Sequence, residues 1–230
     1  YPVIHTCAAC GSHNFTEKNF GTEKIEELIV DEFPSARVAR MDYDSIKGKH
    51  DHDNLIKLFE QQRIDILVGT QMVVKGLDFE HVNLVGILDA DGILNFTDFR
   101  VNERAFQLME QVSGRAGRKN RKGLVMIQAI AINHPVLQFV RQHDYAGFYK
   151  KEIAERQQFG YPPFTRLIRI TLRHAKVETV NKTAAWLGGE LKNQLGERVL
   201  GPAIPGIPRI RNKYLSEIMI KYPNNRVSGE

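Results

Sequence analysis

The sequence predicts an α/β protein: a layer with a parallel sheet, followed by a small α+β domain. Two observations support this fold class. In the first 160 residues, helical segments alternate with short apolar runs bounded by glycine or polar residues, a pattern typical of buried parallel strands flanked by helices. After Gly160-Tyr161-Pro162-Pro163, apolar and basic side chains alternate residue by residue, as in half-exposed strands. We therefore expect a domain boundary at about residue 160.

The first region, residues 21–160, is expected to form the parallel-sheet layer. Thr22 is a plausible N-cap for a helix that runs to about Asp31, and Phe33-Pro34 ends it. A strand and a second helix are expected next, and then three buried strands. In order, these segments are Val38 to Met41, Asp51 to Gln62, Ile64 to Val68, Val82 to Leu88 and Leu124 to Ile130.

Two longer helices are expected beside these strands. One begins near Asp98 and leads to Gln111, and the other runs from His134 to Gln158 with a break near Asp144. The second helix has an aromatic stripe that is more typical of a core than of a base-stacking platform. Its members are Tyr145, Phe148, Tyr149 and Phe159.

Composition narrows the class of protein. The chain has 230 residues, of which 42% are hydrophobic and 26% are charged, as in a soluble globular protein. No apolar run reaches the ~18 residues of a membrane span, and the start lacks the features of a signal peptide. Only two cysteines occur, which indicates a reducing, cytosolic environment. The chain starts at Tyr1 rather than at methionine, so we expect a piece of a longer protein.

Residues 1–20 contain both cysteines, as Cys7-Ala-Ala-Cys10-Gly11. This spacing is half of a zinc ribbon, because two thiolates on a turn can face one ion and a structural zinc needs four ligands. His5 and His13 are candidates for the remaining ligands, although incidental histidines are the more probable interpretation. We expect the other ligands to lie outside this chain.

Two acidic residues, Asp89 and Asp91, follow the second buried run at strand spacing. Paired carboxylates can bind a metal or transfer protons. A structural or salt-bridging role is favoured here, because no histidine or third acid follows at ligand spacing.

The loop after the first buried run has the chemistry of a ligand-binding loop. Ligands of parallel α/β sheets bind beyond the carboxyl ends of the strands, and this loop begins there. Thr70 and Gln71 offer hydrogen-bonding groups, Lys75 a point charge, Gly76 a place for close backbone approach, and Asp78 an acceptor for a ribose hydroxyl or an arginine. A solvated turn is the plain alternative.

The stretch Gln111-Val-Ser-Gly114-Arg115-Ala-Gly117-Arg118 has a spacing that suggests a phosphate-facing element. If it is helical, Gln111, Arg115 and Arg118 share one face. Gly114 leaves the neighbouring backbone uncovered, and guanidinium groups fit phosphate oxygens. The alternative is the basic end of a surface helix, where cations are favourable in any case.

The second region, residues 161–230, is strongly basic. It carries 12 Lys and Arg against 5 Asp and Glu, a net charge of +7, whereas residues 1–160 carry 20 against 22. A strand over Ile168 to Arg173, an amphipathic helix over Val177 to Leu195, and strands at Val199 to Pro202 and Leu215 to Tyr222 predict an open α+β layer.

A basic loop lies between the last two strands of this region. Arg209, Arg211 and Lys213, together with Lys221, are candidates to follow a phosphate backbone, and Tyr214 is a candidate to stack on a base. The alternative is a solvated basic surface without a partner.

Taken together, these motifs resemble those of superfamily 2 helicases. Gly69-Thr-Gln-x-x-x-Lys-Gly-x-Asp78 resembles motif V, and the Gln111 to Arg118 stretch resembles motif VI. Further segments, at Phe33 to Asp42, Asp144 to Tyr149 and Tyr161 to Phe164, resemble the PriA family of replication-restart helicases. The resemblance covers essentially the whole chain.

The resemblance implies a fold and a set of roles. Residues 21–160 would be most of a second RecA-like lobe of P-loop NTPase type, and residues from 161 would be part of a C-terminal domain. Gln111, Arg115 and Arg118 would be catalytic, acting on ATP with Mg²⁺, and Gly76, Asp78 and Gly114 would lie at the nucleotide. Thr70, Gln71 and Lys75 would contact DNA, and Cys7 and Cys10 would belong to a region that binds two zinc ions.

The same resemblance implies partners and location. The family acts as a 3′-to-5′ helicase on DNA forks, D-loops and single strands, and it contacts the single-stranded-DNA-binding protein and other primosome proteins in the bacterial cytoplasm. No membrane is involved.

The departures from the family pattern limit these expectations. The chain contains neither a G-x-x-x-x-G-K-[ST] phosphate loop nor a D-E-x-H motif, so the chain alone is not expected to hydrolyse ATP. The last helix and strand of the C-terminal domain also look absent. A non-catalytic DNA-binding or protein-binding module, or another superfamily 2 translocase, is the alternative.

Overall fold

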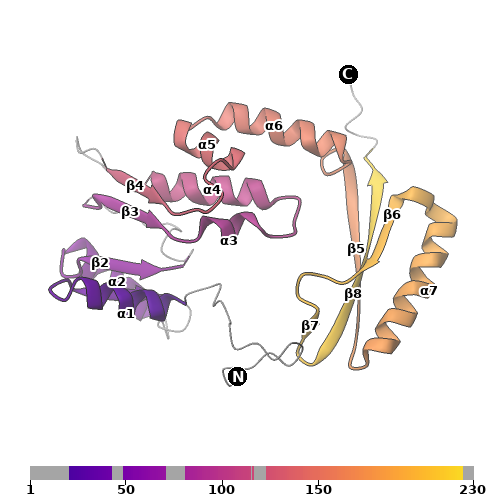
Figure 1. Ribbon diagram of the computed structural model, residues 1–230, viewed down its shortest axis with the longest axis horizontal. Coiled ribbons are helices and arrows are strands. Elements are labelled where there is room, and N and C mark those ends of the chain that lie inside the picture. The colour runs from indigo at the N-terminus through magenta and orange to yellow at the C-terminus, as the bar shows by residue number, and fades with distance from the viewer. Residues whose placement is uncertain (1–20, 43–48, 71–80, 115, 117–122, 225–230) are drawn as a thin grey trace. The chain divides into compact units, whose positions relative to one another are not determined.

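A computed structural model describes residues 21–42, 49–70, 81–114, 116 and 123–224 (Figure 1). By its internal contacts the chain divides into two compact units. Unit 1 comprises Tyr1–Phe96 and Arg104–Val140, and unit 2 comprises Thr97–Glu103 and Arg141–Glu230. Among the described residues, no helix combines the length and the apolar character that crossing a membrane requires.

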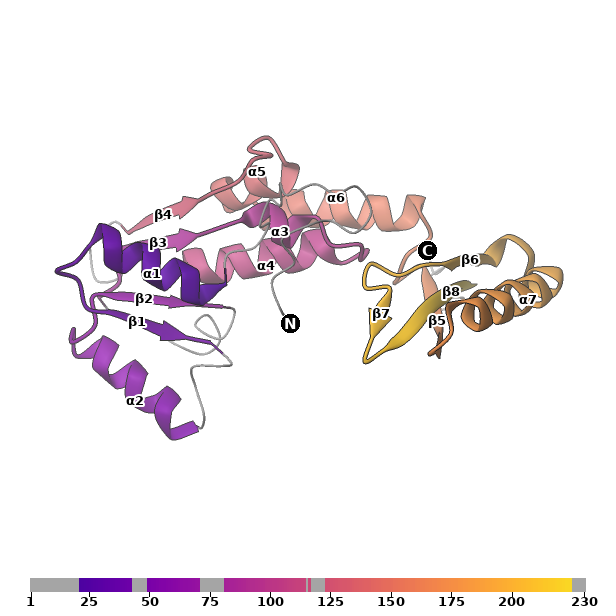
Figure 2. The same cartoon turned by 60° about the horizontal axis from the view of Figure 1, so that its bottom comes forward.

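The first half of unit 1 is a β-α-β arrangement. Helix α1 (Thr22–Glu32) precedes strand β1 (Val38–Met41), and helix α2 (Lys49–Glu60) connects β1 to strand β2 (Ile66–Gly69). The two strands pair in parallel from Val38 opposite Ile66 to Met41 opposite Gly69. Figure 2 shows this strand pair between α1 and α2. The expected parallel arrangement is therefore confirmed for this pair.

The second half of unit 1 repeats the parallel arrangement. Strand β3 (Leu84–Ile87) pairs in parallel with strand β4 (Leu124–Ile127). Between them lie helices α3 (Ala90–Leu94) and α4 (Val101–Ser113), and helix α5 (Pro135–Gln142) follows β4. The core of this half consists mainly of side chains from α4 and α5, namely Ala105, Phe106, Met109, Val136 and Val140.

Burial in β3 and β4 differs from the expectation of fully buried strands. Leu84, Leu124 and Met126 are exposed, and exposed residues alternate with less exposed ones along both strands. This alternation is typical of a sheet that is covered on one face only.

Unit 2 is built on an antiparallel sheet. Helix α6 (Tyr145–Gln158) leads to strand β5 (Thr165–His174), which is followed by helix α7 (Val177–Leu195), the short helix η2 (Gly196–Arg198) and strand β6 (Val199–Ala203). Strands β7 (Arg209–Ile210) and β8 (Lys213–Pro223) form a hairpin. The order is β5-β8-β6, with β7 also paired to β8.

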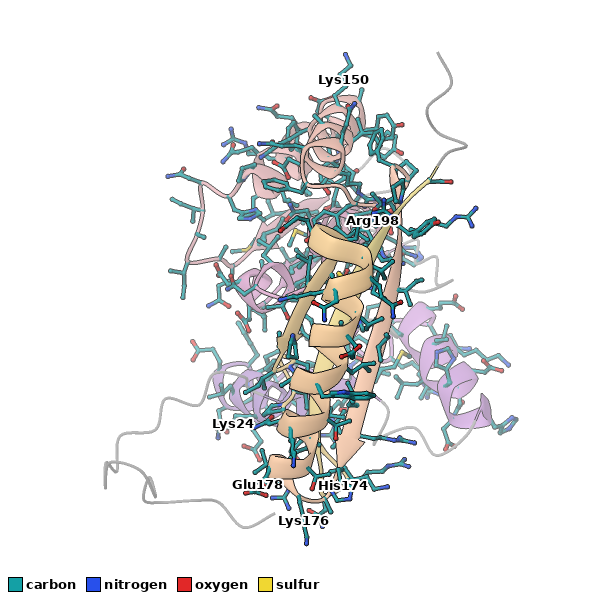
Figure 3. The ribbon with its side chains drawn as sticks, turned by 90° about the vertical axis from the view of Figure 1, so that its right-hand side faces the viewer. Lys24, Lys150, His174, Lys176, Glu178 and Arg198 are labelled. Atoms are coloured by element: carbon teal, nitrogen blue, oxygen red, sulfur yellow. The ribbon has the colours of Figure 1, made fainter. Side chains whose placement is uncertain are left out.

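Helix α7 covers one face of this sheet. Figure 3 shows the helix in front of the strands, with Glu178 near its start and Arg198 beyond its end. The core beneath it contains Val199, Ile218 and Ile220, and partly buried residues of β5 and α7 pack against them. These are Ile170, Leu172, Leu187, Leu191 and Leu195. The predicted amphipathic helix over Val177 to Leu195 is confirmed in its bounds.

Two sequence-based predictions, on the N-cap of α1 and on the aromatic stripe, were wrong, and a third, on Ile168, holds for its direction only. The N-cap of α1 is Gly21 rather than Thr22, because the Thr22 hydroxyl donates instead to the carboxylate of Asp42. Ile168, on an apolar position of the alternating strand, pairs with the core residue Ile220 and so lies on the expected inward face, although it is 51% exposed. The aromatic stripe was expected to lie in the core, and only Phe148 is buried, whereas Tyr145, Tyr149 and Phe159 are exposed.

Candidate functional site

The carboxyl ends of β1 and β2 lie side by side and bring two candidate polar residues to one edge. Because Met41 pairs with Gly69, Asp42 and Thr70 both follow at this edge. Thr70 is exposed. The other predicted residues of this loop, Gln71, Lys75, Gly76 and Asp78, lie outside the described residues.

Asp42 is engaged in a local network. Its side chain is buried, accepts a hydrogen bond from the Thr22 hydroxyl, and lies 3.4 Å from Nε of Arg40. Arg40 also lies 3.5 Å from a carboxylate oxygen of Glu26. The network therefore fastens the start of α1 to the end of β1, beside the loop that begins at Thr70.

The two acids after β3 have structural roles. Asp89 caps α3, because its side chain accepts from the Gly92 amide at 3.1 Å. Asp91 accepts from the amides of Ile130 and Ala131 at 2.6 and 3.0 Å, which also hold its pKa below the ordinary value. The favoured structural interpretation of this pair is confirmed. No cluster of potential metal ligands is found in the part of the chain that the structure describes.

Helix α4 ends earlier than the predicted arginine stripe requires. It includes Gln111 but ends at Ser113, and Gly114 donates to the Glu110 carbonyl at 2.9 Å. The amide of Ala116 then bonds the Ser113 carbonyl at 3.2 Å, which is the tighter spacing of a turn. The helix as described therefore ends before Arg115 and Arg118, and the low helix propensity of Gly114 explains the end. The shared face of Gln111, Arg115 and Arg118 stays a prediction, because both arginines lie outside the described residues.

The remaining candidates of this region lie outside the described residues. They are Arg115 and Arg118 of the motif and Cys7 and Cys10 of the expected zinc region. Gln111 and Gly114 are both exposed at the end of α4. Their predicted catalytic and nucleotide-binding roles stay predictions.

The β7–β8 hairpin carries most of the predicted DNA-binding residues of unit 2. Its turn consists of Arg211 and Asn212, both with positive φ, at 47° and 60°, as a two-residue hairpin turn requires. Arg209, Arg211 and Lys213 are exposed. The Arg209 guanidinium lies 4.9 Å from the centre of the Tyr214 ring, so one face of this ring is already covered.

Sequence reasoning missed two further arginines. Arg169 and Arg173 of β5 pair with Met219 and Leu215 of β8. Directly paired residues share a face, and the alternate pair Ile170 and Ile218 belongs to the core under α7. Arg169 and Arg173 therefore lie on the opposite, open face of the sheet, and both are exposed. The basic alternation of β5 was the signal that pointed to them.

Charge on this open face is mostly positive. Thr171 and Arg173 are exposed beside Arg169, whose Nε lies 3.8 Å from the Glu217 carboxylate. Lys213 has the same parity along β8 as Leu215 and so belongs to this face too. Arg209 pairs with Tyr214, which has the parity of Ile218, so Arg209 lies on the other side of the hairpin from this open face. We use the name basic surface of unit 2 for Arg169, Arg173 and Lys213 of the open face together with Arg209 and Arg211 of the hairpin.

Lys221 has the parity of the open face along β8, but its ammonium group is engaged elsewhere, so we do not include it in this surface. Its Nζ donates to the Phe159 carbonyl at 2.6 Å and lies 4.1 Å from the centre of the Tyr161 ring, and burial lowers its pKa. The ammonium group is therefore used to join the end of α6 to the sheet. We accordingly leave Lys221 out of the candidate DNA-binding residues.

Comparison with known proteins defines first the class and then the family. Residues 14–120 match the model of the helicase conserved C-terminal domain. The helices and parallel strands of unit 1 are those of such a RecA-like lobe. Residues 157–229 match the model of the primosomal protein N C-terminal domain, the region that forms the antiparallel sheet.

Relatives extend this match to nearly the whole chain. The replication restart protein PriA of Bacillus subtilis is 43% identical over 223 residues, and that of Synechocystis is 40% identical over 220 residues. The match to the Haemophilus influenzae protein is 33% identical over 226 residues. These alignments cover 96%, 95% and 96% of this chain, respectively. The chain belongs to the PriA family of replication restart proteins.

The relatives are much longer than this chain. The chain spans 28%, 26% and 31% of the three proteins, respectively. A solved structure, the C-terminal domain of the DEAD-box protein Dbp5, is 18% identical, with a TM-score of 0.38 and coverage of 60% of this chain and 77% of that one. At that score the likeness adds nothing to the assignment.

Proposed function

We propose that this chain supplies the second motor lobe and the C-terminal domain of an ATP-dependent DNA helicase. The enzyme would unwind DNA in the 3′-to-5′ direction during replication restart. The observation that carries this proposal is the Q-x-x-G-R-x-G-R sequence that begins at Gln111 in the last turn of α4, in a lobe that matches the helicase C-terminal model, within a chain of the PriA family.

The proposed chemistry assigns roles to the residues of unit 1. When bound with Mg²⁺, ATP supplies the phosphoryl group whose transfer drives the enzyme. Arg115 and Arg118 stabilise the negative charge on that group, as fixed cations do at sites of phosphoryl transfer. Gln111, Gly114, Gly76 and Asp78 are assigned to the nucleotide side of the same lobe.

Coupling to DNA is assigned to the loop after β2. Thr70, Gln71 and Lys75 contact the DNA backbone. A change in the nucleotide site would then alter how tightly the loop binds one strand. The position of Thr70 at the carboxyl end of β2 supports this assignment, because ligands of parallel sheets bind there.

The basic surface of unit 2 is assigned to the DNA phosphates. The sequence predicts Arg209, Arg211 and Lys213 as phosphate-binding residues. We add Arg169 and Arg173 to this set. Tyr214 stacks on a base with the ring face that Arg209 leaves uncovered. The DNA would include forks, D-loops and single strands.

The remaining proposals follow from the family. Cys7 and Cys10 would be the last pair of a cysteine-rich region that holds two zinc ions. The single-stranded-DNA-binding protein and other primosome proteins would be partners. The location would be the bacterial cytoplasm, at the nucleoid.

Unwinding polarity tests this proposal. The complete natural protein that contains this chain is mixed with duplexes that carry either a 3′ or a 5′ single-stranded tail, with and without ATP. Movement in the 3′-to-5′ direction starts from a 3′ tail. The proposal therefore predicts ATP-dependent separation of the duplex with the 3′ tail but not of the duplex with the 5′ tail. Movement in the opposite direction, or equal separation without ATP, would contradict it.

A non-catalytic DNA-binding module is the second candidate function. It is favoured by one specific observation: the basic surface of unit 2 lies wholly within this chain, whereas the phosphate-loop motif of a motor does not occur in it. Salt-dependent binding of single strands, in a complete protein that hydrolyses no ATP, would favour this candidate. Another superfamily 2 translocase is disfavoured by the match of residues 157–229.

A further inference from the structure

The segment Thr97–Glu103 lies within residues 14–120, which match the helicase C-terminal model, but it packs within unit 2. Three contacts hold it there. Arg156 of α6 donates to the Glu103 carboxylate at 2.5 Å, and the Asn102 amide donates to Glu152 at 3.0 Å. The Arg156 guanidinium also lies 5.3 Å from the centre of the Phe99 ring. The segment is therefore fixed in place by partly buried charged groups.

An aromatic stack forms at the start of this segment. The rings of Phe99 and Tyr161 lie parallel, with 9° between their planes and 5.1 Å between their centres. Lys221 lies against Tyr161, and its ammonium is fixed by the Phe159 carbonyl. Phe99 and Tyr161 are partly buried. The stack therefore gives a rigid support to the side chain that contacts it.

Arg100 extends this stack toward solvent. Its guanidinium lies 4.9 Å from the centre of the Phe99 ring, and the residue is exposed. Its backbone amide donates to the Asp98 side chain at 2.9 Å, which sets the direction of the chain here. Among the described residues, no carboxylate forms an ion pair with this guanidinium. Within the described ranges, this planar cation is thus held against an aromatic ring with no carboxylate paired to it.

The loop that leads to the hairpin lies beside the same segment. A Cβ atom at Gly206 would lie 3.3 Å from the Thr97 hydroxyl, so the backbone of this loop closely approaches Thr97. The loop continues directly into Arg209 and Arg211 of the basic surface. The segment that carries Arg100 therefore lies, within unit 2, next to the loop that leads into the proposed DNA-binding surface.

We propose that Arg100, supported by the Phe99–Tyr161 stack, is a binding site for an unpaired base of single-stranded DNA. A guanidinium plane can stack on a base and at the same time attract the adjacent phosphate, and every base offers a flat face. The guanidinium is planar by resonance, and its contact with Phe99 limits its orientations before DNA arrives, which reduces the entropy lost on binding. This inference rests on the proposed DNA binding and adds a contact from the helicase segment to it.

The test compares two probes of equal charge. One is a thymine oligonucleotide, and the other is an abasic strand of the same length, which has the phosphates but no bases. Binding of each to the 230-residue chain is measured by fluorescence anisotropy at several salt concentrations. Arg100→Ala should weaken binding of the thymine strand by about tenfold, a typical effect of losing one stacking contact, and binding of the abasic strand by less.

Arg100→Lys separates stacking from charge. Lysine keeps the positive charge but lacks the guanidinium plane. This variant should bind the abasic strand like the unmodified chain, and should still bind the thymine strand several-fold more weakly. Arg100→Ala should in addition reduce the slope of log affinity against log salt by about 0.7, the value for one phosphate contact on a single strand.

Arg198 provides a matched control. Its guanidinium lies 5.7 Å from the centre of the Tyr222 ring, and it is also exposed in unit 2, at the labelled position beyond α7 (Figure 3). Arg198→Ala should leave the affinity for both probes within about twofold. If Arg198→Ala weakens binding as much as Arg100→Ala, or if the two probes are affected equally, the proposed base site is wrong.

The outcomes separate this inference from the proposed function. If the unmodified chain binds neither probe, DNA binding by unit 2 and the Arg100 site both fail. If it prefers the thymine strand and Arg100→Ala keeps that preference, only the Arg100 site fails. Arg100 is exposed, so its variants should unfold at the same temperature as the unmodified chain.

Discussion

At the scale of single residues, three acidic side chains accept hydrogen bonds that hold the local structure. Asp89 caps a helix, Asp42 accepts from Thr22, and Asp91 links the loops that follow two strands. The sequence alone placed Asp89 and Asp91 together but left a metal site open as an alternative. The structural role of Asp91 rests on hydrogen bonds from the backbone amides of residues 130 and 131. These residues lie about 40 positions away, and no local sequence pattern predicts that contact.

Asp91 gives a stability prediction that depends on pH. Its pKa is lowered by the Ile130 and Ala131 amides, so its stabilising effect is present above the unfolded-state pKa of about 3.9 and is lost as pH falls through the folded-state value. Asp91→Asn should therefore unfold at lower urea concentration at pH 7, with a difference that narrows below about pH 4. Asp31→Asn, on the exposed end of α1, is the control. An equal difference at both pH values would contradict this account.

Glu152 gives a prediction of opposite sign. Burial raises its pKa, while Asn102 donates to it, so the contribution of Glu152 to stability is greatest below the unfolded-state pKa of about 4.3 and falls as pH rises. Glu152→Gln keeps an acceptor for Asn102 and removes the charge. The variant should unfold at a higher temperature than the unmodified chain at pH 7, with a smaller gain at pH 4. A lower unfolding temperature at pH 7 would show that the carboxylate charge stabilises the fold.

At the scale of elements, periodicity predicted the type and order of most helices and strands. The strand at Val38–Met41 and the helix at Val177–Leu195 match the expected bounds, because an amphipathic face or a short apolar run determines both. The end of α4 and the exposure of Tyr145 and Tyr149 were not predicted. The helix end follows from the low helix propensity of Gly114. The exposure of the two tyrosines depends on which surfaces the rest of the chain covers, and periodicity carries no information on that.

Two adjacent glycines of α7 provide a matched test of its packing. A Cβ atom at Gly188 would lie 2.9 Å from Cδ of Pro202, whereas at Gly189 nothing lies within 4 Å. Gly189→Ala should stabilise the chain by about 0.5–1 kcal/mol through helix propensity. Gly188→Ala should destabilise it by about 1–3 kcal/mol, because the rigid proline ring has to shift. Chemical denaturation measures both, and equal effects would mean that α7 does not pack on β6 as described.

At the scale of the whole molecule, the charge separation along the chain has a clear consequence. Residues 161–230 carry a net charge of +7, whereas residues 1–160 carry a small negative charge. Unit 2 should therefore account for most of the affinity for a polyanion. This asymmetry agrees with the proposed function, in which a motor lobe is followed by a domain that binds DNA.

Salt dependence tests this division. Arg173→Ala and Lys213→Ala remove two cations of the basic surface, and each should weaken binding of single-stranded DNA and reduce the log-log salt slope by about 0.7. Arg37→Ala in unit 1, where Arg37 is already paired with Asp65 at 2.6 Å, should leave the slope unchanged. If Arg37→Ala reduces the slope as much as the two unit 2 variants do, the assignment of DNA binding to unit 2 is wrong.

The most direct test of the central proposal is DNA-dependent ATP hydrolysis by the complete natural protein, measured with Arg118→Ala, Arg118→Lys and, as a control, Arg141→Ala on the exposed end of α5. The motor-lobe account predicts that Arg118→Ala lowers kcat by about 10³-fold or more, that lysine restores only a small part, and that Arg141→Ala hydrolyses ATP normally. An Arg118→Ala protein with undiminished DNA-dependent kcat would contradict the account.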